Sequence, residues 1–153
     1  MPHKINELLE NREFISVATC DFEGRPNAAP KFLLKLENNW IFLIDYVIGR
    51  TWQNIKINPR VSLSFVDTNT LMAYQINGPV EIIENGPVYE KMMQELELKE
   101  IDLATKRIIE GVEKGHIHEG FEVSLPERVV ILKVTMEEIV EIGHSGILNR
   151  QIL

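Results

Sequence analysis

The stretch from Asp45 to Arg60, DYVIGRTWQNIKINPR, contains residue types that together could bind an anion. Gly49 allows a tight turn, and Arg50 and Thr51 then fall in the first turn of a predicted helix. A helix start has free N–H groups and the positive end of the helix dipole. A guanidinium and a hydroxyl there would form a site for a phosphate monoester. A solvated helix cap has the same pattern, so these residues alone leave both interpretations open.

Clear signals bound this helix on both sides. The apolar run Trp40–Ile44 predicts a strand, Trp40–Asp45, before it. Asn58-Pro59 should end it, because proline disfavours helical backbone at the preceding residue. Val61–Val66 then alternates strictly between apolar and polar residues, which is typical of a half-buried strand.

The rest of the chain is predicted to contain more strands and a helical insertion. Strands are predicted at Phe14–Cys20, Asn27–Leu36, Leu71–Glu84 and Val129–Val134, and helices at Lys4–Arg12, Pro87–Leu98 and Asp102–Lys114. Asn77-Gly78-Pro79 should interrupt the strand Leu71–Glu84 with a bulge or bend. The run Glu95–Glu100 is expected to be a solvated helix face. The apolar tail 143–153 is expected to dock on the body or on a second subunit.

Composition narrows the class of protein. The 153 residues are 44% hydrophobic and 25% charged, which predicts one globular domain, 1–153. A net charge of −7 argues against nucleic acid as a partner. Cys20 is the single cysteine, so neither an internal disulfide nor a cysteine zinc site is possible, and a buried thiol is expected. Without a signal-peptide core or a membrane-length apolar run, we expect a cytoplasmic protein with no membrane partner.

His116 and His118 form an H-x-H pair just after the insertion 86–115. Two histidines on one face of a strand could bind a divalent metal. No matching third ligand is evident, so two solvated histidines in a loop are the preferred interpretation. We expect no metal. The sequence also lacks a Ser-His-Asp order, a P-loop and a Rossmann glycine pattern.

The order of these motifs resembles a known family. The segments that carry the similarity are, in order, a loop with Gly24-Arg25-Pro26, the strand 27–35, Gly49-Arg50-Thr51 and Asn58-Pro59-Arg60-Val61. Through them the chain is similar to the pyridoxamine 5′-phosphate oxidase-like, FMN-binding split-barrel proteins, especially the small FMN-binding type. The resemblance covers about residues 14–84. It implies a mainly β fold: a six-stranded antiparallel split barrel with peripheral helices and a helical insertion before the last strand. It also implies a homodimer with FMN at the subunit interface.

The resemblance further implies a set of FMN contacts. Gly49, Arg50 and Thr51 match the segment that holds the phosphate, and Asn54 matches a polar position on the same helix. The ring and ribityl chain would lie against two strand segments and receive polar contacts from the partner. The residues that match these segments are Ala29, Pro30, Lys31 and Phe32, then Asp45 and Tyr46, and finally Gln75 and Asn77.

The chain also departs from the oxidase itself. The oxidase has arginine where Pro30 stands and lysine where Thr51 stands. Its C-terminal Arg and His, which recognise the vitamin substrate, have no clear match, although His144 and Arg150 are in the region. We therefore do not expect oxidation of vitamin B6.

Three functions follow from these observations. The first is an FMN-dependent oxidoreductase that passes electrons from a donor such as NAD(P)H to a small-molecule acceptor. The second is a non-enzymatic flavin carrier or electron-transfer module. The third is a haem- or deazaflavin-handling relative on the same fold. The sequence assigns no catalytic acid or base.

Overall fold

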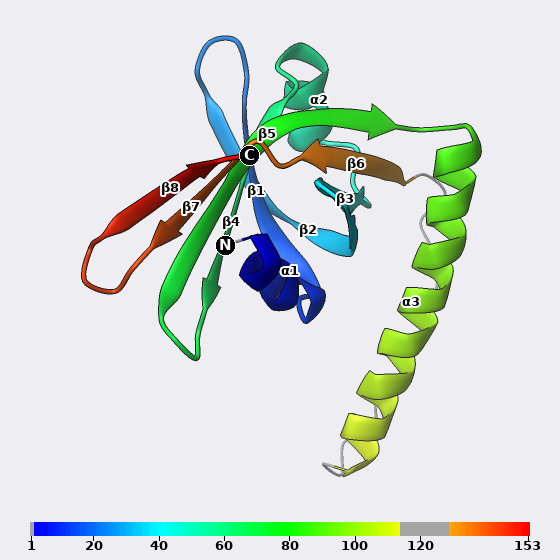
Figure 1. Ribbon diagram of the computed structural model, residues 1–153. Coiled ribbons are helices and arrows are strands. Elements are labelled where there is room, and N and C mark those ends of the chain that lie inside the picture. Colours follow the sequence, from blue (N-terminus) through cyan, green and yellow to red (C-terminus); the bar gives the residue numbers. More distant parts are fainter. Residues whose placement is uncertain (1, 114–128) are drawn as a thin grey trace.

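The computed structural model describes residues 2–113 and 129–153 (Figure 1). His116 and His118 lie outside the described residues. The elements in chain order are α1 (Pro2–Glu10), β1 (Phe14–Cys20), β2 (Pro26–Glu37), β3 (Trp40–Asp45), α2 (Arg50–Ile57), β4 (Arg60–Asp67), β5 (Met72–Ile83), α3 (Pro87–Glu113), β6 (Val130–Thr135), β7 (Glu138–Ile142) and β8 (Leu148–Ile152).

Six of the strands close into an antiparallel barrel. Their order is β4-β1-β2-β3-β6-β5, and pairing of β4 with β5 closes the ring. The prediction of a mainly β, six-stranded barrel is confirmed. The sheet continues from β5 into β7 and β8, two strands that the sequence patterns did not separate. This hairpin and α3 extend from different sides of the barrel (Figure 1).

Strand β5 is continuous through the expected break at Asn77-Gly78-Pro79, but it changes partner there. Ala73–Asn77 pair with β7, whereas Val80–Ile83 pair with β6. Gly78 lies at the change, and a Cβ atom on it would be 1.8 Å from the main-chain oxygen of Thr135. The glycine is therefore needed for a close approach of two backbones.

The insertion forms one helix and not two, which corrects the prediction of separate helices at Pro87–Leu98 and Asp102–Lys114. The residues between them, Lys99, Glu100 and Ile101, include no glycine or proline, so the backbone has no reason to break. The chain of helical hydrogen bonds continues for 27 residues.

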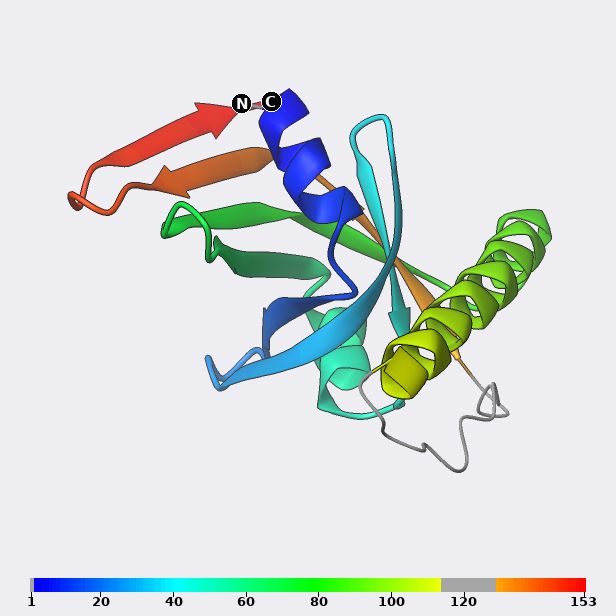
Figure 2. The same cartoon turned by 90° about the horizontal axis from the view of Figure 1, so that it is seen from below.

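Two apolar clusters hold the elements together. The first fills the barrel and includes Ile5 and Leu9 of α1, which are 0% exposed. Figure 2 shows α1 lying across one end of the barrel. The second cluster lies between α3 and the outer face of β2, β3 and β6, with Phe32, Met92 and Leu96 among its members. Each fully buried side chain of this size contributes about 1.5–3 kcal/mol.

Candidate functional site

The first turn of α2 presents positive groups at the surface. Gly49 is the N-cap and offers no side-chain hydrogen bond to the helix start. The first N–H groups of α2 therefore lack side-chain cover. Arg50 is exposed, and its guanidinium forms no hydrogen bond or ion pair with another described residue. Helix dipole, free N–H groups and guanidinium all favour an anion at this point.

The next residues of α2 face the barrel. Thr51 and Asn54 are 2% and 4% exposed. The amide of Asn27 donates to the Thr51 hydroxyl at 3.3 Å, and the amide of Asn54 donates to the Thr19 hydroxyl at 3.1 Å. These two bonds fix α2 on β1 and β2. The Thr51 hydroxyl accepts the first of these bonds, so its own proton is still available.

Lys31 and Asp45 form a buried ion pair at 2.8 Å. The Lys31 side chain is 10% exposed, and that of Asp45 is 0% exposed. Oδ1 of Asp45 also accepts from the N–H of Val47 at 3.1 Å. The second oxygen, Oδ2, is buried and has no hydrogen-bond partner among the described residues. A buried acceptor without a donor is uncommon, and it fits a site that a ligand donor completes.

Phe32 and Tyr46 lie where α3 crosses the barrel. Phe32 is 4% exposed, with its ring 6.2 Å from the Tyr46 ring. The phenol of Tyr46 donates to the carboxylate of Glu100. Burial, and then this hydrogen bond, raise the pKa of Tyr46 above its ordinary value.

Lys99 makes the second contact of α3 with this region. Its ammonium donates to the main-chain oxygens of Leu33 at 2.6 Å and Leu34 at 3.0 Å, and it lies 5.2 Å from the centre of the Phe32 ring. The β2 register shifts between Leu33 and Lys35, and such a bulge frees carbonyl groups. Burial lowers the pKa of the Lys99 ammonium.

The contacts of α3 correct the view of Glu95–Glu100 as a solvated face. Glu95 pairs with Lys35 at 3.1 Å, and Lys99 and Glu100 bind the barrel. No sequence pattern indicates this role, because charged residues at helical spacing are also typical of a solvated face. Only the packing of Met92 and Leu96 shows which way the helix faces.

Gln75 and Asn77 lie on the outer face of the barrel. Val17, Leu63 and Ile76 point inward and are 0% exposed, so the alternating residues on their strands point outward. Cross-strand pairing joins the outward residues into two rows, which we name the uncharged sheet face: Pro30, Ser16, Ser64 and Gln75 in one row, and Ala28, Ala18, Ser62 and Asn77 in the next.

The structure therefore brings some predicted residues together and separates others. Gly49, Arg50, Thr51 and Asn54 lie on α2. Ala29, which is partly exposed, stands on β2 between Lys31 and the strand start, so the Lys31–Asp45 pair lies nearby. Phe32 and Tyr46 lie under α3. Gln75 is three strand spacings from Pro30, or about 14 Å, so one chain cannot place both against the same small group.

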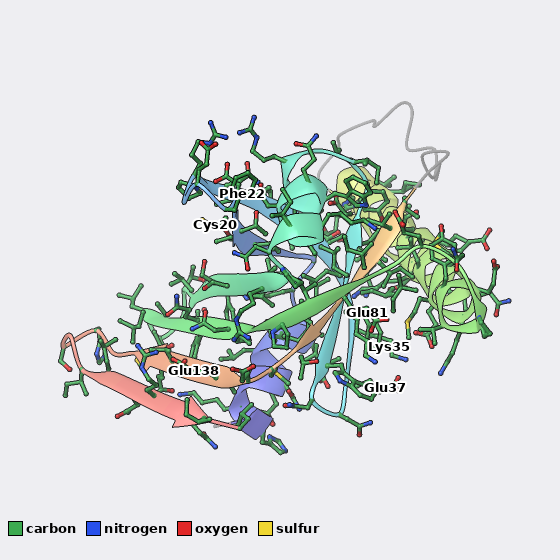
Figure 3. All side chains as sticks on the ribbon, turned by 90° about the horizontal axis from the view of Figure 1, so that it is seen from above. Cys20, Phe22, Lys35, Glu37, Glu81 and Glu138 are labelled. Atoms are coloured by element: carbon green, nitrogen blue, oxygen red, sulfur yellow. The ribbon has the colours of Figure 1, made fainter. Side chains whose placement is uncertain are left out.

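Three further predictions concern Cys20, the apolar tail and His144. Cys20 is half-buried at the end of β1, not fully buried, and its thiol donates to the main-chain oxygen of Asp21. Figure 3 shows Cys20 and Phe22 at the turn that follows β1. The tail forms β8, in which Arg150 pairs with Glu138. His144 is exposed in the turn before it.

Within residues 2–113 and 129–153, no group of three or more His, Cys, Asp and Glu side chains could hold a metal ion. No helix in the same part of the chain is long and apolar enough to cross a membrane.

The chain has recognisable relatives. It is 30% identical over 67 residues to haem oxygenase HutZ of Vibrio cholerae, a match that spans 44% of this chain and only 38% of HutZ. HupZ of Group A Streptococcus has a similar structure, with a TM-score of 0.64 and 24% identity over 94% of this chain and 95% of HupZ. A pyridoxamine 5′-phosphate oxidase-related, FMN-binding protein of Nostoc punctiforme has a TM-score of 0.59 and 14% identity over 97% and 91%.

The match to a family profile covers most of the sequence. Residues 1–140 match the profile described as pyridoxamine 5′-phosphate oxidase. This match includes the whole barrel and α3, and the fold agrees with it. The chain therefore belongs to the pyridoxamine 5′-phosphate oxidase family.

Proposed function

We propose that this protein binds FMN and acts as an oxidoreductase, passing electrons from a reduced donor such as NAD(P)H to a small-molecule acceptor. The observation that carries the proposal is the start of α2, where the exposed guanidinium of Arg50 stands beside a helix end without side-chain cover. A phosphate dianion is the group that such a set of donors fits best.

The surrounding residues are compatible with the rest of FMN. The proton of the Thr51 hydroxyl provides a donor, and Oδ2 of Asp45, which has no partner among the described residues, provides an acceptor. Gly49 and Arg50 would hold the phosphate, and the β2 residues Ala29–Lys31 would contact the ring and ribityl chain. FMN supplies the electron-transfer chemistry when bound, and the protein orients it and excludes water.

A second copy of the chain would complete this site. Eight outward positions on four strands carry no charge, in a chain of which 25% is charged. Outward positions of a solvated sheet are usually charged or strongly polar. A homodimer formed through the uncharged sheet face would cover it. Gln75 and Asn77 would then reach the FMN of the partner subunit, which fits their distance from Pro30.

The direct test is reconstitution. We expect purified protein to bind added FMN with one site per chain, seen as quenching of flavin fluorescence, and then to consume NADH or NADPH with an artificial acceptor. Binding without turnover would favour the alternative of a flavin carrier or electron-transfer module. A protein that neither contains nor binds FMN would refute the proposal.

The similarity to HutZ favours one second candidate, a haem-handling protein. Haem needs an axial ligand, most often histidine. Among the described residues, the two histidines are exposed, His3 beside Glu7 and His144 in the β7–β8 turn. Neither is on α2 or β2. The absorption spectrum distinguishes the two candidates: a Soret band would support haem, and flavin bands would support FMN.

A further inference from the structure

Helix α3 has a second apolar face, opposite the one that packs on the barrel. Met92, Leu96 and Leu103 contact the barrel cluster. With about 100° per residue, Thr105 lies nine residues and about 180° from Leu96. Exposed apolar residues gather on this far side: Leu98 and Val112 are 71% and 73% exposed, and Ile101, Ile108 and Ile109 are also exposed.

The spacing of this face, which we name the α3 stripe, is that of a helix–helix seam. Positions 98, 101, 105, 108 and 112 are separated by three, four, three and four residues, as in a heptad repeat. Thr105, at the centre, does not interrupt the seam with an unpaired hydroxyl. Its Oγ1 donates to the main-chain oxygen of Ile101 at 2.8 Å, which leaves the methyl group to pack outward.

We propose that the α3 stripe pairs with the α3 stripe of a second copy, in antiparallel orientation. The apolar positions are almost symmetric about Thr105, with Leu98 and Val112 each seven residues from it. A helix turned end for end therefore presents nearly the same seam, as an interface between identical chains requires. The stripe is about 22 Å long, so its pairing is weak and depends on concentration.

Charge selects the antiparallel orientation. One edge of the stripe carries Asp102 followed by Lys106, which form an exposed ion pair at 3.1 Å. In an antiparallel pair the order along this edge is reversed in the second helix, so Asp102 approaches Lys106 of the partner subunit. A parallel pair would instead place this edge against the opposite edge of the second helix, where the exposed Glu97 lies, so that Asp102 and Glu97 would repel.

This contact is separate from the uncharged sheet face. In the order β4-β1-β2-β3-β6-β5, strands β1 and β4 are opposite β3 and β6. The uncharged sheet face is centred on β1 and β4, whereas α3 covers β3, β6 and the second half of β2, and extends from that side (Figure 1). One two-fold axis cannot join both faces, so the stripe would link the dimers of the proposed function into larger assemblies.

The test measures mass and cross-linking on the full chain. We expect sedimentation of the wild type to show association beyond the dimer as concentration rises. Ile101→Asp/Ile108→Asp should abolish this step and halve the mass at high concentration, without loss of helix by circular dichroism, because both side chains are exposed. Glu110→Lys, a charge change at an exposed position about 140° around the helix from Thr105, is the matched control and should associate like the wild type.

Cross-linking tests the geometry without a disruptive change. In a Cys20→Ser background, Thr105→Cys should oxidise to a disulfide-linked pair, because position 105 faces its own copy. Val112→Cys should not, because antiparallel pairing places it opposite Leu98. Cross-linking of both variants would mean parallel pairing. That outcome, cross-linking of neither variant, or unchanged association in the double aspartate variant would each overturn the proposal.

Discussion

At the scale of single residues, the exposed guanidinium of Arg50 is the group on which the phosphate site depends. Replacing Arg50→Ala removes a charge-assisted hydrogen bond and leaves the backbone of α2 unchanged. We expect FMN affinity to fall by about 1.5–3 kcal/mol, which is roughly ten- to a hundredfold in Kd. Fluorescence titration measures this. Lys56→Ala, in the last turn of the same helix, is the control and should bind like the wild type. Equal affinity for all three proteins would mean that the phosphate lies elsewhere.

The Lys31–Asp45 ion pair should affect the stability of the fold, because it is buried inside the protein. Lys31→Met would leave the Asp45 carboxylate buried without its cation. We expect the free energy of unfolding to fall by about 3–5 kcal/mol. The double change Lys31→Met/Asp45→Leu removes both charges and should recover most of that loss, because well-packed apolar replacements of a buried pair are often neutral. Urea unfolding of the two variants measures this. A double variant no more stable than the single one would contradict it.

At the same scale, residue types were easier to predict than their surroundings. The start and end of α2 were predicted correctly from Gly49, Arg50 and the helix-ending Asn58-Pro59, because turn and helix-stop signals are local. The burial of Thr51 and the partner of Asp45 are tertiary facts. They depend on Asn27 and Lys31, which are distant in sequence and have no periodic pattern that connects them to α2.

At the scale of elements, local signals predicted the strands of the barrel but not how the additional elements attach to it. The alternation of Val61–Val66 gave β4, and the family order gave the closed ring. The contacts of Lys99 and Glu100 were missed, because a charged helix residue is assigned to solvent unless its packing is known. The change of partner in β5 was missed because β7 had not been recognised as a separate strand.

A substitution of Gly78 tests whether the change of partner in β5 needs this glycine. In Gly78→Ala the new Cβ would be 1.8 Å from the main-chain oxygen of Thr135, so backbone must move. We expect a loss of about 3 kcal/mol or more, at the upper end of the usual cost of overpacking. Gly143→Ala is the control, since its Cβ would be in ordinary contact with the oxygen of Ile147 at 3.5 Å. Its effect should stay within about 0.5 kcal/mol. Thermal unfolding compares them, and equal stability would show that β5 and β6 can separate without cost.

At the scale of the whole molecule, the uncharged sheet face and the start of α2 should act together, because the proposed FMN site needs both chains. Ser64→Lys places a charge at the centre of that face, on an exposed position that the fold of one chain tolerates. We expect the mass of the main species at micromolar concentration to halve, and FMN binding to weaken with it, although residue 64 is on a different element from Arg50.

Glu81→Lys, an exposed change elsewhere on the barrel, should alter neither property. Sedimentation and FMN titration on the same samples distinguish the possibilities. A Ser64→Lys monomer that binds FMN at full strength would place the whole site within one chain, whereas an intact dimer would place the interface on another face.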